Sequence, residues 1–277
     1  MNKLQKVLYS LASDRAWLSG SHSGLISRTK YIPAKYYALF SQPGSINYLG
    51  RKFRYDNKNT PVTLQSYPAE IQRLNQWVDF SEPTNVLDVG ANIGQFSFTL
   101  NAVHPGTNVF AFEPNPSAYS ILSKNIENIG NIHQYNYALG PPGKMNFYFV
   151  QGASAKGSFI ETNASINLGN VKTDKLEVEL VELDGATCDQ LGIPEKFDLV
   201  KIDVEGFEYE VLNAIRHIDT RFMYIEFSMA RAHKYSFYEL LDRISDYFGL
   251  ADVLYCDQID LLDDERTIGN LLVKCGS

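Results

Sequence analysis

The stretch Val86-Leu87-Asp88-Val89-Gly90-Ala91-Asn92-Ile93-Gly94-Gln95-Phe96 decides the fold of this chain. It opens with an apolar run, interrupted only by Asp88, that is short enough to be a buried strand. Two glycines follow, and the apolar residues from Phe96 to Val103 have the spacing of a helix. The stretch therefore predicts a strand, a tight turn and a helix, with a ligand site at the carboxyl end of the strand.

The turn indicates what kind of ligand this site takes. Gly90 and Gly94 let the backbone approach a ligand closely, and Asp88 places a carboxylate near the start of the helix. A dinucleotide fingerprint reads G-x-G-x-x-G, whose middle glycine leaves room for a pyrophosphate. Here the loop reads G-x-x-x-G with Asn92 in the middle, so the ligand need not carry phosphate.

A second strand supports a nucleoside-type cofactor. Residues Asn108 to Phe112 are mostly apolar and are followed by Glu113. This acid comes about twenty residues after Gly94, the distance at which an acid usually meets ribose hydroxyls. A carboxylate there can accept hydrogen bonds from both hydroxyls at once.

Composition restricts the class of protein. The 277 residues are 44% hydrophobic and 21% charged, which is typical of a soluble globular protein. The sequence contains no apolar run of about eighteen residues, so it predicts no transmembrane segment. The first residues make a poor secretory signal, and we therefore expect a cytoplasmic protein. Cys188, Cys256 and Cys275 show neither disulfide nor zinc spacing, and we predict no bound metal.

Charge is distributed unevenly along the chain. Residues 1–60 contain ten basic and two acidic residues, a net charge of +8, which leaves −15 on the remainder. An acidic body argues against a nucleic acid partner. The basic, tyrosine-rich arm could dock an anionic substrate or a membrane face. Alternatively, it packs on the acidic body or forms an oligomer contact.

The order of the predicted elements gives the fold class. We expect an N-terminal cap over residues 1–80, with a helix at 4–11, two strands turning at Gly50, and a helix from Ala69 to Phe80. From Val86 strands and helices alternate, which is the pattern of a doubly wound, mostly parallel α/β sheet over 81–277. The remaining predictions are a helix from Pro116, strands at 132–139, 197–203 and 222–228, a helix at 237–244, an insert at about 144–183 that could form a lid, and a terminal antiparallel hairpin of 252–256 with 271–275.

Several motifs give the chain a family resemblance. They are VLDVGANIGQFS, FAFEPNPSAYSILSKNI, YALG, VELDGATCDQL, and VKIDVEGFEYEVLNA followed by YIEFS. Over residues 84–275 the chain resembles the FkbM family of S-adenosylmethionine-dependent methyltransferases, which have a Rossmann-like sheet. The resemblance implies that the methionyl end of the cofactor rests on the Asp88 to Gly94 loop and that Glu113 holds its ribose. Asn136 and Ala138, at the end of the third strand, would then face the adenine.

The family is associated with methyl transfer to a hydroxyl of a sugar, a glycan precursor or a natural product. A hydroxyl is a weak nucleophile at neutral pH, and a positioned base helps to remove its proton. Asp203 and Glu226 lie at or near strand ends that face the cleft, and His233 follows shortly after, so these three are the predicted catalytic residues. Glu205 and Glu208 begin the next helix and are expected to complement its dipole.

Other functions remain open at this point. A nicotinamide-dependent oxidoreductase would use Glu113 equally well, but the loop lacks its pyrophosphate glycine. A nucleic-acid methyltransferase is disfavoured by the acidic body. A non-catalytic module that keeps the cofactor fold is a further alternative, as are an anionic or lipid-linked acceptor, a homo-oligomer and peripheral attachment to a membrane.

Overall fold

A seven-stranded central sheet forms the middle of the molecule, and its order is β11-β12-β10-β9-β3-β4-β5. The computed structural model describes residues 44–56, 60–149, 157–161, 173–230, 236–261 and 266–276, so the helix predicted at 4–11 lies outside the described residues. The strands of this sheet are β3 (Asn85–Val89), β4 (Asn108–Phe112), β5 (Ile132–Tyr135), β9 (Lys196–Asp203), β10 (Asp219–Ala230), β11 (Leu250–Leu261) and β12 (Arg266–Cys275).

Strand directions confirm a doubly wound sheet. Strands β5, β4, β3, β9 and β10 are parallel, and β12 and β11 add an antiparallel hairpin at one edge. From β3 the chain winds outward through β4 to β5, and it then returns to the other side of β3 with β9. The order therefore reverses between β3 and β9, which is where ligands bind in open α/β sheets.

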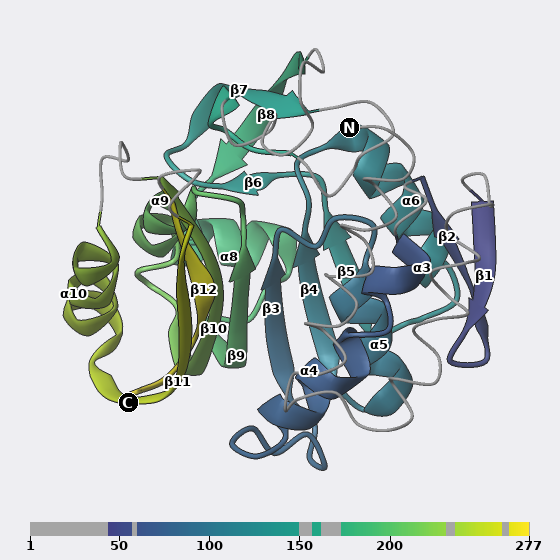
Figure 1. Ribbon diagram of the computed structural model, residues 1–277, viewed down its shortest axis with the longest axis horizontal. Coiled ribbons are helices and arrows are strands. Elements are labelled where there is room, and N and C mark those ends of the chain that lie inside the picture. The colour runs from purple at the N-terminus through teal and green to yellow at the C-terminus, as the bar shows by residue number, and fades with distance from the viewer. Residues whose placement is uncertain are drawn as a thin grey trace.

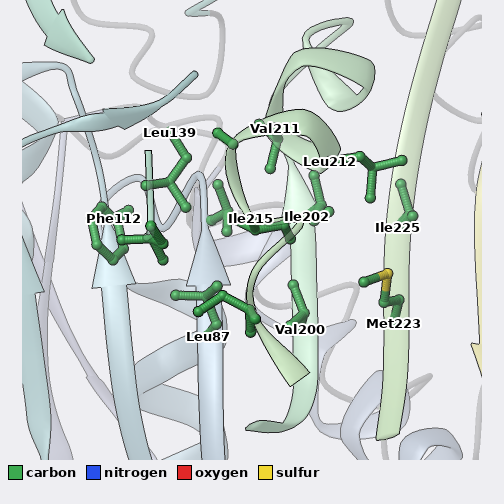
Figure 2. Packing of buried hydrophobic residues seen from close by; sticks show 14 of the residues in the cluster. Leu87, Phe112, Leu139, Val200, Ile202, Val211, Leu212, Ile215, Met223 and Ile225 are labelled. Atoms are coloured by element: carbon green, nitrogen blue, oxygen red, sulfur yellow. The ribbon is translucent and has the colours of Figure 1, made fainter. Parts of the chain in front are cut away.

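Helices cover both faces of the sheet (Figure 1). On one face, α4 (Tyr67–Leu74), α5 (Gln95–Val103) and α6 (Pro116–Ile126) share a buried cluster with Val86 and Leu199. On the other face, α8 (Gly185–Leu191), α9 (Glu208–Ala214) and α10 (Phe237–Phe248) pack on residues that alternate with those. Figure 2 shows this second cluster, in which Val200 and Ile202 of β9 lie beside Met223 and Ile225 of β10.

The hairpin of β1 (Gly44–Tyr48) and β2 (Arg51–Tyr55) confirms the turn predicted at Gly50, where φ is +80°. Its Phe53 is fully buried, and the ring lies 5.1 Å from the ring of Phe98 in α5. The side chain of Asn125 in α6 bonds to both the N–H and the carbonyl of Arg54. The described part of the predicted cap thus shares a core with helices α5 and α6, while a boundary at residue 80 stays a prediction.

A small three-stranded sheet lies over the carboxyl ends of the central strands (Figure 1). It consists of β6 (Ala138–Leu139), β8 (Asp174–Val181) and β7 (Gly143–Phe149). The single strand predicted at 132–139 is therefore wrong, because the chain leaves the central sheet after Tyr135. At that break Asn136 donates to the carbonyl oxygens of Glu113 and Pro114, which holds the chain in its new direction.

Two helices differ from the expectation. The helix predicted at Ala69–Phe80 runs from Tyr67 to Leu74 and is followed by turns. The helix α8 was not predicted, although its signals are present in the sequence. Asp184 accepts a hydrogen bond from the N–H of Thr187 at its start, and Gly192 ends it with φ +68°.

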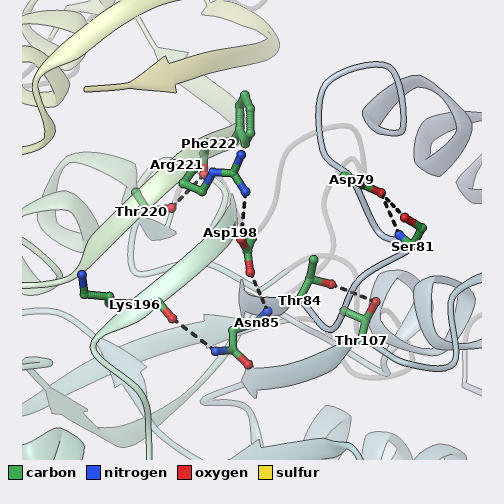
Figure 3. A network of polar contacts seen from close by, with 10 residues as sticks. All are labelled: Asp79, Ser81, Thr84, Asn85, Thr107, Lys196, Asp198, Thr220, Arg221 and Phe222. Carbon is green, nitrogen blue, oxygen red and sulfur yellow. Dashed lines mark hydrogen bonds and ion pairs between the residues drawn. The ribbon is translucent and has the colours of Figure 1, made fainter. Parts of the chain in front are cut away.

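Polar contacts tie together the amino ends of the strands, opposite the ligand end (Figure 3). The carboxylate of Asp198 in β9 accepts from the N–H of Asn85 in β3 at 3.0 Å and from Arg221 in β10 at 3.2 Å. One side chain thus fixes three adjacent strands in register. Separately, none of the helices in the described ranges has the length and hydropathy needed to cross a membrane.

Candidate active site

A cleft opens at the carboxyl ends of β3, β4, β9 and β10, beneath the small sheet. Its lining includes six residues from the strand ends and the loops that follow them: Gly90, Asn92, Glu113, Ala138, Asp203 and Glu226. Thr63 and Tyr67 close it from the N-terminal side, and Phe147, Phe159 and Phe207 close it from the insert and the loop before α9. The position agrees with the switch point of the sheet.

Four N–H groups of the loop after β3 donate hydrogen bonds to other groups of the protein. Gly90 and Ala91 both donate to the carbonyl oxygen of Phe112, at 3.0 and 2.9 Å, and Gly94 donates to Ala91. The N–H of Asn92, which has φ +52°, donates to Glu113. A phosphate-binding loop needs such groups free to point at the anion. The loop therefore suits a ligand without pyrophosphate.

Glu113 is buried, with 6% of its surface exposed, and its carboxylate is fixed by the backbone. One oxygen accepts from the N–H of Asn92 and the other from the N–H of Asn115, both at 2.8 Å. Burial raises the pKa of Glu113 to about 7, and the two hydrogen bonds act in the opposite direction. Its remaining lone pairs can accept from ligand hydroxyls.

Other features of the cleft suit a nucleoside. The buried side-chain oxygen of Asn92 has no hydrogen-bond partner among the described residues, so it can accept from a ligand. Phe112, Tyr137 and Leu139 add apolar surface to the lining of the cleft. Asn136 is exposed and does not line the cleft.

A buried ion pair lies directly below the loop. Asp88 is fully buried and accepts from the hydroxyl of Ser97 in α5. Lys201, aligned with Asp88 on the neighbouring strand, places Nζ 3.5 Å from its Oδ1. Burial opposes the charge of Lys201, but Asp203 and Asp88 together raise its pKa above the ordinary value. This lysine belongs to the K-I-D-V-E-G block and was not predicted as a site residue.

Asp203 and Glu226 lie side by side at the edge of the cleft. They are register partners on the parallel strands β9 and β10, so both side chains point to the same face. Lys201 is two residues before Asp203 and shares that face, with its Nζ 3.2 Å from Asp203 Oδ2. The neighbouring Asp203 raises the pKa of Glu226 well above its ordinary value, although the residue itself is exposed at the cleft.

Helix α4 brings to the site two further side chains that were not predicted from the sequence. Tyr67 lines the cleft, and burial raises the pKa of Glu70, one turn later, to about 7. The charges of Lys201 and Asp203 both act on Glu70. A helix was predicted here, but only the tertiary structure shows which of its faces meets the strand ends.

The turn after β9 has an unusual backbone conformation and is held by Glu208. Glu205 has φ +50° and Gly206 has φ +102°. Glu208 is almost fully buried and accepts from the N–H of Gly206 at 2.8 Å. Burial raises the pKa of Glu208 to about 8. Glu208 thus fixes this tight turn, in addition to lying in the first turn of α9 as expected.

The described piece of the insert, residues 157–161, contacts this turn. The hydroxyl of Ser158 donates to the carbonyl oxygen of Glu205 at 2.9 Å, and the ring of Phe159 lies 4.4 Å from that of Phe207. Phe159 also lines the cleft. The predicted lid therefore meets the ligand end of the sheet in this piece, while the rest of its middle lies outside the described residues.

The predicted site residues separate into three groups. Gly90, Asn92, Glu113, Ala138, Asp203 and Glu226 line the cleft. Asp88 lies beneath it, Gly94 starts α5 against Leu122, and Asn136 braces the loop after β4. His233 lies outside the described residues. No group of three or more His, Cys, Asp or Glu side chains in the described ranges is arranged to hold a metal.

Comparison with known proteins identifies the family. Residues 88–249, from the acid of β3 to the end of α10, match the model of the methyltransferase FkbM domain. The chain belongs to this family of methyltransferases, as its motifs predicted, and the cofactor of the domain is S-adenosylmethionine.

The chain aligns with part of the length of each of two relatives. The chain is 32% identical over 138 residues to the hexuronic acid methyltransferase AglP of Haloferax volcanii, covering 49% of this chain and 52% of that protein. It is 30% identical over 171 residues to the 31-O-demethyl-FK506 methyltransferase FkbM of Streptomyces tacrolimicus, covering 53% of this chain and 65% of that one. The alignments thus span between half and two thirds of these relatives.

A solved structure resembles most of the chain. The N-terminal domain of EvdMO1 with SAH bound is 14% identical, covers 93% of this chain and all of that one, and has a TM-score of 0.49.

Proposed function

We propose that this chain is an S-adenosylmethionine-dependent O-methyltransferase acting on a hydroxyl of a sugar, a glycan precursor or a natural product. The observation that carries the proposal is the pairing of Asp203 with Glu226 at the edge of the cleft. A carboxylate within hydrogen-bond reach of a hydroxyl removes its proton as the oxygen attacks.

The cofactor is proposed to lie on the loop between Asp88 and Gly94. Glu113 would accept from its ribose hydroxyls, and the unpartnered oxygen of Asn92 would accept from a further donor. When bound, S-adenosylmethionine supplies an electrophilic methyl group. The cleft residues then contribute chiefly by holding the acceptor oxygen in line with that carbon.

The relatives support transfer to oxygen. The name of one specifies methylation of an oxygen, and that of the other specifies a hexuronic acid, which carries hydroxyl groups. An anionic or lipid-linked acceptor is a finer form of the proposal. Its support is the basic arm, of which Arg51 and Lys52 are exposed on the β1–β2 hairpin.

The test is methyl transfer from isotopically labelled S-adenosylmethionine to a panel of neutral sugars, uronic acids and other alcohols, with products identified by mass spectrometry. Asp203→Asn and Glu226→Ala are expected to lower turnover by roughly 100-fold or more while cofactor binding persists. The matched control is Asp252→Asn, an exposed strand position on β11.

Other outcomes would favour other functions. A labelled methyl group on nitrogen or carbon would overturn transfer to oxygen. Tight cofactor binding without transfer to any acceptor would favour the non-catalytic alternative. Binding of NAD with no binding of S-adenosylmethionine would favour an oxidoreductase.

A further inference from the structure

Lys201 lies closer to Asp203 than to Glu226, the other carboxyl group at the edge of the cleft. Lys201 Nζ lies 3.2 Å from Asp203 Oδ2 and 3.5 Å from Asp88 Oδ1. Within the described part of the chain, Lys201 has no ion pair with Glu226. The buried positive charge therefore lies on the Asp203 side of the pair.

The surroundings of Glu226 otherwise disfavour a negative charge. The negative charges of Asp203 on β9, Glu205 in the turn after β9 and Glu70 on α4 all act against ionisation of Glu226. The charge of Lys201 acts in the opposite direction on Glu226, but the ammonium group of Lys201 is closely paired with Asp88 and Asp203. On the other side, the register partner of Glu226 on β12 is Asn270, which is uncharged.

We propose that Lys201 is a positioning residue that holds Asp203 as the carboxylate, so that the proton of the Asp203–Glu226 pair resides on Glu226. Two carboxylates on adjacent strand ends repel each other, and the pair lowers its energy by keeping one proton. Contact with an ammonium group selects Asp203 as the member that stays ionised.

Distinct environments then give the two groups distinct tasks. This step rests on the proposed function. Asp203 accepts the proton of the attacking hydroxyl, and the neutral carboxyl of Glu226 donates a hydrogen bond to a second oxygen of the acceptor molecule. This arrangement suits an acceptor with two neighbouring oxygens, such as a vicinal diol. Lys201 itself acts through Asp203.

The test is a pH titration by carbon NMR of the full chain labelled at the side-chain carboxyls of Asp and Glu, which needs neither cofactor nor acceptor. Glu226→Gln and Asp203→Asn assign the two signals. At neutral pH we expect the Glu226 signal to be that of a carboxylic acid and the Asp203 signal that of a carboxylate. The reverse assignment, or two carboxylates at neutral pH, would overturn the proposal.

Variants at Lys201 test the cause. Lys201→Met should shift the Asp203 signal toward the protonated form at neutral pH, whereas Lys201→Arg should keep it as a carboxylate. The control is Lys196→Met, which removes an exposed lysine paired with Asp219 on the same two strands. If Lys201→Met does not fold, the titration of the unmodified chain still decides the location of the proton. A proton located as predicted in a protein without methyl transfer would reject only the proposed function.

Discussion

A Cβ atom on Gly90 would lie 1.9 Å from the carbonyl oxygen of Asp203. The loop after β3 and the end of β9 therefore touch through their backbones at the point where the sheet reverses direction. Gly90 also has φ +82°, a conformation that other residues adopt at a cost. The glycine is required by the close approach of two strand ends as well as by the turn.

From this contact we expect Gly90→Ala to lower the free energy of unfolding by about 3 kcal/mol or more, since backbone must move to relieve the clash. Cofactor binding should weaken in parallel, because the movement displaces both the loop and Asp203. Chemical denaturation and calorimetric titration measure the two effects. In the control Gly130→Ala the added Cβ meets nothing within 4 Å, so little change is expected. Unchanged stability and binding in Gly90→Ala would contradict the close approach.

The buried acid Glu113 predicts that cofactor binding releases a proton. Its pKa is raised to about 7 by burial, so part of the population is protonated near neutral pH. Hydrogen bonds from the ribose hydroxyls and the positive charge of the sulfonium both favour the ionised form and lower this pKa. Titration with S-adenosylmethionine near pH 7 should therefore release a fraction of a proton, measured by calorimetry in buffers of different ionisation enthalpy.

S-adenosylhomocysteine serves as the control for this prediction, because it lacks the sulfonium charge and should release less. The release should also disappear about two pH units higher, where Glu113 is already ionised, and in Glu113→Gln. Equal release with both ligands would show that the proton does not respond to the sulfonium charge.

The architecture was predictable because it follows from local patterns. Apolar runs followed by Asp88 and by Glu113 mark β3 and β4, whose parallel pairing follows from the helix between them. The pairing of β11 with β12 was likewise predictable from two apolar segments near the chain end.

The composition of the site was only partly predictable, because it depends on which strands become neighbours. Asp88 meets Lys201 because β9 returns to the side of β3, over a hundred residues later in the chain. Lys201 and Asp203 are two residues apart on one strand and therefore share a face, but this spacing does not specify which helix covers that face. Tyr67 and Glu70 reach the site through the packing of α4 on α5, which no local pattern specifies.

The burial of Phe53 predicts that the β1–β2 hairpin unfolds together with the rest of the fold. The ring packs against those of Tyr48 and Phe98, so Phe53→Ala leaves a cavity and should cost about 3–5 kcal/mol. We expect a single unfolding transition at a lower temperature in calorimetry. Met145→Ala, at a 38% exposed position, should change little. Two separate transitions would instead support the predicted domain boundary near residue 80.

Glu208 predicts a pH dependence of stability with a defined sign. Its pKa in the folded chain is about 8, well above its ordinary value, so folding favours the protonated form. The stability it contributes is complete at low pH and is lost as the pH rises from about 4.5 to about 8, by up to about 1.4 kcal/mol per unit.

Glu208→Gln cannot ionise, and its side-chain oxygen can still accept from the N–H of Gly206. The free energy of unfolding of this variant, relative to the unmodified chain, should therefore rise over this range and level off above it, as measured by urea denaturation at several pH values. Titration of Glu70 and Glu113 is common to both proteins and cancels in the difference. The exposed Glu82→Gln provides the control, with a difference that stays constant with pH. A constant difference for Glu208→Gln as well would mean that the buried carboxyl is ionised across the whole range.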